Sequence, residues 1–421
     1  MVLASLIGTT AEMYDFFVYA SAAGLVFGRQ FFPSLDATAG LLASFATLGV
    51  SFVARPLGAL LAGYVGDRFG RKTVLVVSIV LMGVSTVGVG LLPGYDTIGV
   101  AAPVLLVLLR LLQGISTGGE WPSAALILIE HAPPARRGFL GSFPQVGVPA
   151  GLLLANLAFI AVSAATSPAA FQSWGWRIPF LSSAVLVGIG LFVRTRVSES
   201  PVFEELRHRG GRIPAPLAVV FRHHARAVLT AIGLFIANSA VGYVLITFMN
   251  SYGTGTLGLS RSLMLAIGMV GALAWAAFTI LGGRWCDSHG RKRIYLVGTT
   301  ALALWAIPCF LLLDTRSVPL MVLAAVGLAF GLGLTSAPQA AAFAELFPAT
   351  VRSTGVTFAH AFGSVLGGGF APFLATWLAD RTGTSMAVAA YLIVTCLITL
   401  AAAAALRERS VLLSTTYQNA P

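Results

Sequence analysis

Long stretches of apolar residues recur along the whole chain, and they limit the fold more than any other feature. A helix that crosses the hydrocarbon core of a membrane needs roughly 20 mainly apolar residues, whereas a barrel strand needs only about 9–11. Twelve stretches have the helical length, and we expect each to form a transmembrane helix: 7–27, 39–62, 73–92, 98–128, 139–162, 176–195, 228–251, 262–284, 293–313, 319–344, 355–379 and 384–405. The sequence therefore predicts an all-α membrane protein.

The composition narrows the class further. Of the 421 residues, 57% are hydrophobic and only 10% are charged, against roughly 25% charged in soluble domains. Soluble enzymes and nucleic-acid-binding proteins are therefore excluded, and the lipid bilayer is the expected partner. The three cysteines show no paired spacing, and no metal-ligand motif is present. We expect no metal, no cofactor and a monomer.

Basic residues are distributed unevenly between the two sides of the predicted spans. Nineteen of the 26 Lys and Arg fall in every second connecting segment and in the C-terminal tail, and five fall in the alternate segments. Because basic residues collect on the cytoplasmic side of membrane proteins, this distribution places both termini in the cytoplasm. Glu12 and Asp15 within the first stretch argue against a cleaved signal peptide. We therefore expect a multi-pass protein of the inner (plasma) membrane.

Two segments of the chain repeat each other. The sequence GYVGDRFGRK at 63–72 recurs as GRWCDSHGRK at 283–292, an offset of 220 residues. Internal duplication is common in secondary transporters, which bind substrate between the repeats. We expect two pseudo-symmetric six-helix bundles, 1–196 and 227–421, the second ending in a short cytoplasmic tail. The basic segment 197–226 then forms a cytoplasmic linker.

These motifs resemble those of the major facilitator superfamily. GYVGDRFGRK is similar to its most specific signature, and RLLQG at 110–114 is similar to its second motif. Within the superfamily the chain resembles the metabolite:proton symporter family, through GTTAEMYDFFVY at 8–19, ARPLG at 54–58 and QGISTGGEW at 113–121. The resemblance implies carriers of organic anions and zwitterions, such as shikimate, 2-oxoglutarate, citrate, and proline or betaine.

Five charged residues lie inside the predicted spans of the first half, where each costs about 2.5–3.5 kcal/mol on insertion scales. Asp15 and Arg110 lie at similar depth, and we expect them to pair and to carry proton coupling. Burial favours a neutral carboxyl group, whereas a nearby guanidinium favours the carboxylate. By resemblance, such a pair serves coupling in proton-driven sugar porters. Glu120 is an alternative proton site, and Glu12 is a further candidate for proton coupling. Glu12 lies one turn closer to the cytoplasm than Asp15, where it belongs either to the cytoplasmic gate or simply to the headgroup region.

Arg55 is the expected substrate clamp, because a guanidinium binds a carboxylate through two parallel hydrogen bonds. Packing of helices is the alternative role for this charge. Further polar residues inside the spans are expected to bind substrate: Tyr14, Tyr19, Gln113, Asn238, Tyr243 and Gln339. Gln145, Asn156, Asn250 and His360 are less favoured, since lone polar residues in membranes often join helices. Glycines at 147–151 and 367–369 are expected to permit close approach of helices.

The repeated loop motif is expected to act as a cytoplasmic gate. An aspartate there can face the positive N-terminal end of a neighbouring helix, and Arg71 can reach Glu130. By resemblance, such contacts hold the cytoplasmic ends together in the outward-facing state. The gate residues are Gly63, Asp67, Gly70, Arg71, Glu130, Asp287, Arg291 and Glu345.

The resulting hypothesis is a proton-coupled symporter that imports a small organic acid or zwitterion by alternating access. Two alternatives remain: a facilitator or exchanger of organic anions without proton coupling, and a nutrient receptor built like a transporter. An enzyme is not expected, because neither a nucleophile motif nor a phosphate-binding loop is present.

Overall fold

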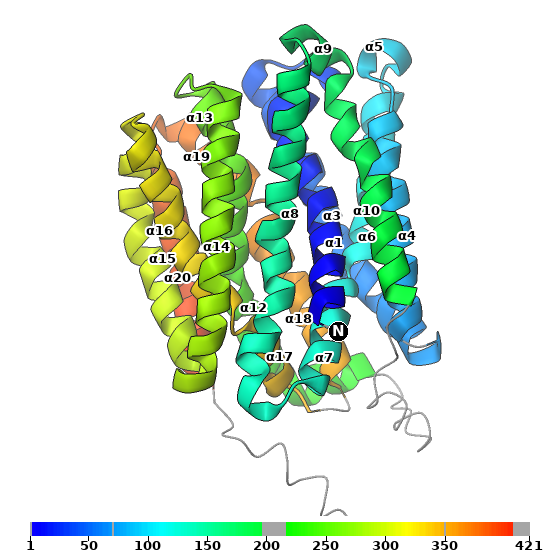
Figure 1. Ribbon diagram of the computed structural model, residues 1–421, viewed down its shortest axis with the longest axis vertical. Helices are drawn as coiled ribbons and strands as arrows, with labels where there is room; N and C mark the ends of the chain where they lie inside the picture. The colour runs from blue at the N-terminus through cyan, green and yellow to red at the C-terminus, as the bar shows by residue number, and fades with distance from the viewer. Residues whose placement is uncertain (1, 70, 196–215, 349–350, 407–421) are drawn as a thin grey trace, which may run out of the picture.

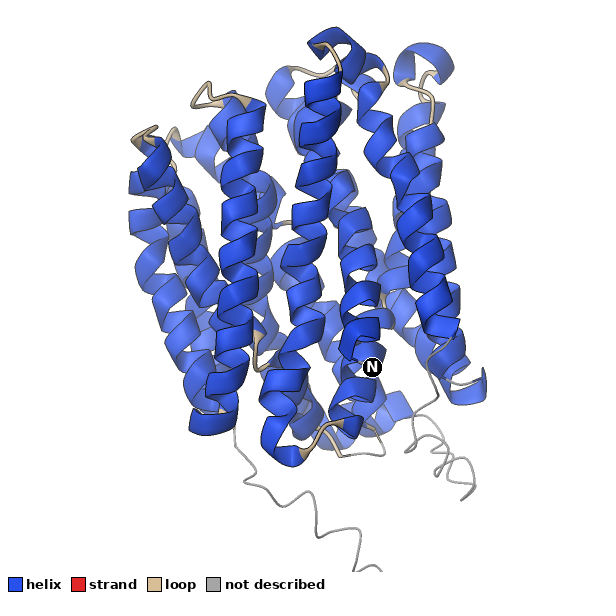
Figure 2. Ribbon diagram, viewed as in Figure 1, coloured by secondary structure: helices blue, strands red, loops and turns tan. Residues whose placement is uncertain are grey.

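The computed structural model describes the chain except for residues 1, 70, 196–215, 349–350 and 407–421. Every regular element of the described residues is helical (Figure 2). The first half comprises α1 (Val2–Ala22), η1 (Ala23–Phe27), α2 (Gly28–Phe31), α3 (Ala37–Phe69), α4 (Arg71–Leu91), α5 (Tyr95–Ile98), α6 (Ala101–Thr117), α7 (Glu120–His131), η2 (Pro134–Arg136), α8 (Arg137–Ala165), α9 (Pro168–Ser173), η3 (Gly175–Arg177) and α10 (Ile178–Thr195). The second half comprises α12 (Pro216–Tyr243), η4 (Val244–Phe248), α13 (Met249–Gly255), α14 (Arg261–His289), α15 (Arg291–Asp314), α16 (Val318–Ser336), α17 (Gln339–Leu346), α18 (Arg352–Ser364), η5 (Val365–Gly369), α19 (Ala371–Thr382) and α20 (Met386–Ala405).

The expected all-α membrane fold is confirmed. Eleven helical stretches of the described residues are long and apolar enough to cross a membrane, and they match the second to twelfth expected spans. The first expected span, which carries Glu12 and Asp15, forms α1 and η1 and is not among those eleven. The long helices run side by side along the vertical direction of Figure 1.

The spans expected at 98–128 and 319–344 are not continuous helices. The first is interrupted at Gly118 and Gly119, between α6 and α7, and the second at Ala337 and Pro338, between α16 and α17. Glycine weakens a helix and proline lacks the N–H that a helix interior requires. Because these two spans occupy equivalent positions in the two halves, the interruption is a shared feature of the repeat.

Two pairs of helices make the most extensive contacts between the halves. Helix α8 packs along α14, as Figure 1 shows, and α3 packs along α18 and the π-helix η5. These are the fifth and eighth spans and the second and eleventh, so each pair maps onto the other when the halves are exchanged. The expected close approach at the glycines is confirmed, since a Cβ on Gly151 would lie 2.6 Å from Met13 Cβ and one on Gly367 would lie 2.5 Å from the Ile236 carbonyl oxygen.

The segment between the halves is described only in part. Helix α12 begins at Pro216, inside the expected linker 197–226, and has non-helical backbone angles at His224. Most of the expected linker lies outside the described residues. The end of the molecule that carries Arg136, His289 and Arg291 is called the basic end below, and it lies at the bottom of Figure 1.

Candidate functional site

A cavity of about 70 Å³ lies between the two halves. Helices α1, α3, α6, α7 and α8 supply one wall, and α12, α14, α16, α17 and α18 supply the other. Its polar lining consists of Glu12, Arg55, Thr117, Gln145, Asn238, Ser239, Tyr243, Ser336, Gln339 and His360. Sites for small molecules usually measure about 300–1,000 Å³, so a substrate must widen this cavity as it binds.

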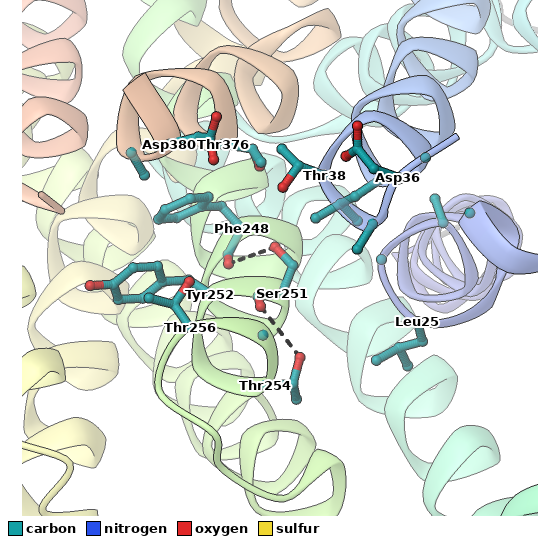
Figure 3. Close-up of a pocket in the computed structure, with 18 of the residues that line it drawn as sticks. Leu25, Asp36, Thr38, Phe248, Ser251, Tyr252, Thr254, Thr256, Thr376 and Asp380 are labelled. Atoms are coloured by element: carbon teal, nitrogen blue, oxygen red, sulfur yellow. Dashed lines mark hydrogen bonds between the residues drawn. The ribbon is translucent and has the colours of Figure 1, made fainter. Parts of the chain in front are cut away.

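A larger pocket of about 870 Å³, called the vestibule below, opens at the end opposite the basic end. Figure 3 shows Asp36 and Thr38 beside Thr376 and Asp380 of α19 on its rim. Arg29 and Arg261 also line the vestibule.

Three aromatic rings separate the vestibule from the cavity. Phe16 of α1, Phe52 of α3 and Tyr243 of α12 contact one another, with ring centroids 5.2–5.7 Å apart. Along each of the three helices, these residues fall between those that line the vestibule and most of those that line the cavity. The rings therefore lie between the two spaces.

Asp15 is completely buried in the first half, and it does not line the cavity. Its Oδ1 accepts a hydrogen bond from Ser183 Oγ of α10, and the Thr86 hydroxyl of α4 faces the carboxyl group. Its Oδ2 has no hydrogen-bond partner among the described residues. One carboxyl oxygen is thus held and the other is available to take a proton.

Arg110 does not pair with Asp15, so the expected ion pair is wrong for this conformation. The Arg110 guanidinium, which is also completely buried, donates to Gln113 Oε1 and, over 3.1 Å, to Ser51 Oγ. Its Cζ lies 3.6 Å from the centroid of the Tyr19 ring. Arg110 meets α1 at Tyr19, which lies on the same face as Asp15 but about one helical turn further along, while the Asp15 carboxyl group is held by Ser183 of α10.

Gln113 and Thr86 connect these two buried charges indirectly. Gln113 accepts from Arg110, and its Nε2 donates to Thr86 Oγ1 over 3.2 Å. Thr86 in turn faces Asp15. Glu120, the alternative proton site, begins α7, is buried, and is a charged neighbour of Asp15. Both candidate proton sites therefore lie inside the first half and outside the cavity lining, and Asp15 adjoins the polar network of Arg110, Gln113 and Thr86.

Arg55 lies on the cavity wall, as does Glu12. The Arg55 guanidinium carbon is 4.2 Å from the centroid of the Phe52 ring and 4.9 Å from that of Phe16. Arg110 lies 5.1 Å from the centroid of the same Phe16 ring. Phe16 thus contacts one arginine of the cavity and one arginine of the buried network, which brings the two groups into proximity.

Three of the residues expected to bind substrate do not line the cavity. The Tyr14 hydroxyl donates to the Pro179 carbonyl oxygen over 2.7 Å, the Tyr19 hydroxyl bonds to Thr47 Oγ1 over 2.6 Å, and Gln113 belongs to the buried network. These side chains join helices within the first half, which is the common role of polar groups in membranes. Asn238, Tyr243 and Gln339 do line the cavity, although Asn238 also donates to α16.

The structure adds residues to the cavity that the sequence reasoning did not favour. Gln145 and His360 were lesser candidates, and Trp121 and Trp275 were not candidates at all. The Trp121 and His360 rings stack, with centroids 4.4 Å apart and planes 13° apart. The pair Gly118–Gly119 was the signal in the sequence that could have identified Trp121. The helix is interrupted at these glycines, and Trp121 follows them at the start of α7, beside the cavity.

Contacts between the halves close the basic end. Asp287 of α14 accepts hydrogen bonds from the backbone N–H groups of Gly138 and Phe139, at the N-terminus of α8, over 2.7 and 2.9 Å. A carboxylate is stabilised there by the helix dipole. Glu130 of α7 lies 4.0 Å from Arg352 of α18, in the other half. The basic end is therefore held shut by charged groups.

Part of the expected gate lies outside the described residues. Gly70 is not described, and neither are the surroundings of Gly63, Asp67 and Arg71. Arg291, which belongs to the second copy of the motif, lies 2.5 Å from Glu345 of α17. Among the described residues, no group of three or more His, Cys, Asp or Glu is placed to hold a metal ion.

Comparisons with known proteins identify the family of this chain. The family model of the Major Facilitator Superfamily matches residues 5–372 and 272–417. The inner membrane metabolite transport protein YhjE of Escherichia coli K12 is 42% identical over 397 residues, which cover 93% of this chain and 90% of the relative. The shikimate transporter of the same organism is 40% identical over 402 residues, which cover 94% of this chain and 91% of the relative.

A solved structure shares the fold. The proton:xylose symporter XylE, bound to 6-bromo-6-deoxy-D-glucose, superposes with a TM-score of 0.77 at 19% identity, covering 96% of this chain and 94% of its own. The expected superfamily is thereby confirmed, together with the expectation of a transporter rather than an enzyme. This chain belongs to the Major Facilitator Superfamily and is a multi-pass membrane transporter of metabolites.

Proposed function

We propose that the protein is a proton-coupled symporter that imports a small organic acid or zwitterion across the inner membrane. The observation that carries this proposal is the cavity between the halves, which contains Arg55 and is closed towards the basic end by Asp287 and Glu130. The vestibule lies at the opposite end. With the basic end in the cytoplasm and the termini on the same side, this arrangement is an outward-facing state with its cavity occluded.

Arg55 binds the carboxylate of the substrate in this scheme. Its guanidinium lies on the cavity wall, against the faces of Phe16 and Phe52. The rings restrict the side chain and leave the N–H groups to meet an anion. Asn238, Tyr243 and Gln339 complete the binding site on the opposite wall. A substrate bound to both walls draws the two halves together, as alternating access requires.

Asp15 carries the proton. It takes the proton on Oδ2 while the vestibule is open, and releases it when the halves rock and the basic end opens. Movement of Arg110 relative to Asp15 changes the balance between its neutral and charged forms. One proton that crosses 100 mV supplies about 2.3 kcal/mol, which supports a concentration gradient on the order of 50-fold.

The gate follows from the contacts at the basic end. The Asp287 contact with α8 and the Glu130–Arg352 pair join the two halves, so both must break before the cavity opens to the cytoplasm. The first copy of the motif, with Gly63, Asp67, Gly70 and Arg71, acts in the same way in this proposal. The two bundles, 1–196 and 227–421, are the units that rock.

The test is uptake by proteoliposomes that contain the purified protein. Shikimate, 2-oxoglutarate, citrate, proline and glycine betaine are first screened for their effect on thermal unfolding. The ligand that stabilises the protein is then added outside the vesicles in weakly buffered medium. Proton symport makes the medium alkaline in step with uptake. Uptake without alkalinisation would instead establish a facilitator or exchanger, and binding without flux would establish a receptor.

A further inference from the structure

One hydrogen-bonded chain in the cavity wall has a fixed direction. It starts at Trp121 of α7, whose indole Nε1–H donates to Gln145 Oε1 of α8 over 3.1 Å. An indole nitrogen can only donate. The oxygen of the Gln145 amide must therefore face Trp121, and its NH₂ group must point the other way.

The direction passes from the first half to the second. Gln145 Nε2 donates to Gln339 Oε1 of α17, a contact between opposite walls of the cavity. Because Gln145 presents its NH₂ group, Gln339 must present its oxygen. The orientation of an amide is normally ambiguous, but here the indole at the start of the chain determines both amides.

The consequence is a donor group without an acceptor. Gln339 has no exposed surface, and its Nε2 has no hydrogen-bond partner among the described residues. Buried N–H groups are almost always satisfied by a partner. Gln339 lines the same cavity as Arg55, so the missing acceptor belongs to whatever occupies that cavity.

We infer that the Gln339 amide is a specificity determinant that donates to an oxygen of the substrate other than the carboxylate at Arg55. The substrate class is then a carboxylic acid that bears a hydroxyl or carbonyl oxygen. An ammonium or quaternary nitrogen offers no lone pair and is disfavoured at this position. Trp121 and Gln145 are positioning residues, which act by fixing the amide of Gln339. The inference rests on the proposed function, because it takes the cavity as the substrate site.

A hydroxyl suits the cavity particularly well. It can accept from Gln339 Nε2 and donate to a carboxylate, and Glu12 lies on the same cavity wall as Arg55. A carbonyl oxygen can only accept. Sites that hydrogen-bond a substrate hydroxyl reject analogues that lack it far more strongly than apolar pockets reject a missing methylene. Gln339 is therefore placed to give strong discrimination.

The test measures binding to the purified full-length protein by calorimetry, with matched ligand pairs. Shikimate is compared with cyclohex-1-ene-1-carboxylate, malate with succinate, and 2-oxoglutarate with glutarate. The wild-type protein is expected to prefer the oxygenated member of at least one pair by about tenfold or more. Gln339→Met keeps the length of the side chain and removes the donor, so it is expected to abolish that preference.

Gln145→Glu tests the direction of the chain with Gln339 intact. A glutamate at this position accepts from both Trp121 and Gln339 Nε2, which turns the Gln339 oxygen towards the ligand. A hydroxyl can still donate to that oxygen, whereas a carbonyl oxygen can only accept. The variant is therefore expected to abolish a preference for 2-oxoglutarate over glutarate. Gln172→Met, in the vestibule, is the matched control and keeps it. Thermal unfolding without ligand verifies that each variant is folded.

Equal binding of both members of each pair by the wild type overturns the inference, and so does binding of none of the six ligands. An oxygen preference that survives Gln339→Met also overturns it. If that variant is unfolded, a preference for 2-oxoglutarate over glutarate that survives Gln145→Glu does the same. Failure of proton coupling has a different signature: the medium stays neutral during uptake while the ligand preference persists.

Discussion

The rings of Trp121 and His360 stack face to face across the boundary between the halves, with planes only 13° apart. Trp121 follows the break in the fourth span, and His360 comes from α18 in the eleventh. His360 also contacts the ring of Phe235, with centroids 4.4 Å apart. The stack lies at the cavity and must separate whenever the two halves move apart at that level.

His360→Ala should therefore weaken the state with a closed basic end. Aromatic pairs contribute about 0.5–1.5 kcal/mol beyond their buried area, so the ratio of closed to open molecules should fall by about 2- to 12-fold. Spin labels on the exposed residues Arg136 and His289, one in each half, report this as a longer mean distance. An unchanged distance distribution would show that the stack has no part in closure.

Asp15→Asn should separate exchange from accumulation. Asparagine resembles the protonated carboxyl and cannot release a proton, so the variant is expected to exchange substrate across the membrane without building a gradient. Its exchange rate should also lose the pH dependence of the wild type. Asp380→Asn, which changes an exposed carboxylate of the vestibule, is the control. Uphill accumulation by the Asp15 variant would rule this residue out as the proton carrier.

Arg55→Lys should weaken carboxylate binding by about 10- to 100-fold, since an ammonium cannot make two parallel hydrogen bonds. The charge is kept, so the loss measures geometry. Arg29→Lys, at the vestibule, should change the dissociation constant less than twofold. Calorimetry with the ligand identified by thermal unfolding provides the measurement. Tight binding by the Arg55 variant would reassign this arginine to helix packing.

Asp287→Asn should open the basic end more often, because it removes a negative charge from the N-terminus of α8. Such contacts contribute about 0.3–2 kcal/mol, which corresponds to a shift of about 2- to 30-fold in the closed-to-open ratio. Asp36→Asn is the matched control, since Asp36 caps the Ala39 N–H of its own half over 2.9 Å. The same spin-label pair should respond to the first change only; equal responses would contradict a gating role.

Gly151→Ala should destabilise the first half. The added Cβ would lie 2.6 Å from Met13 Cβ and 2.7 Å from the Tyr14 backbone nitrogen, so α1 and α8 would have to separate. A loss of about 1–3 kcal/mol is typical of overpacking. Gly188→Ala has no atom within 4 Å of the new Cβ and should leave stability unchanged or raise it by up to about 1 kcal/mol. Thermal unfolding in detergent compares the two, and a similar midpoint for both would be inconsistent with the packing.

The sequence predicted the fold well because its main signals do not depend on how side chains pack. Span length, the placement of basic residues and the repeat at an offset of 220 are all visible without coordinates. The close approach at Gly151 was predictable because the glycines at 147–151 have no side chains to keep two helices apart. The breaks in the fourth and tenth spans were missed, although Gly118–Gly119 and Pro338 mark them, because hydropathy continues across both.

The site was only partly predictable, because hydropathy identifies depth and not direction. Asp15 and Arg110 are expected at the same depth, yet they contact different neighbours, Ser183 and Gln113, and Arg110 meets α1 at Tyr19, about one turn from Asp15. Tyr14 was taken for a substrate contact on the same ground and instead joins α10. Trp121 was missed because an aromatic residue in a membrane span gives no signal by itself. The partner of each side chain depends on how its helix is rotated and on how far it is displaced along its axis. Packing against the neighbouring helices sets both.

Two of the π-helical turns occupy equivalent positions in the two halves: Ala23–Phe27 in the first span and Val244–Phe248 in the seventh. Both supply residues to the vestibule wall. A π-turn holds its residues by wider backbone hydrogen bonds, and helices kink readily there. The outer tips of these two helices can therefore tilt about paired hinges, so that the mouth narrows over an arriving solute while the rest of each bundle stays rigid.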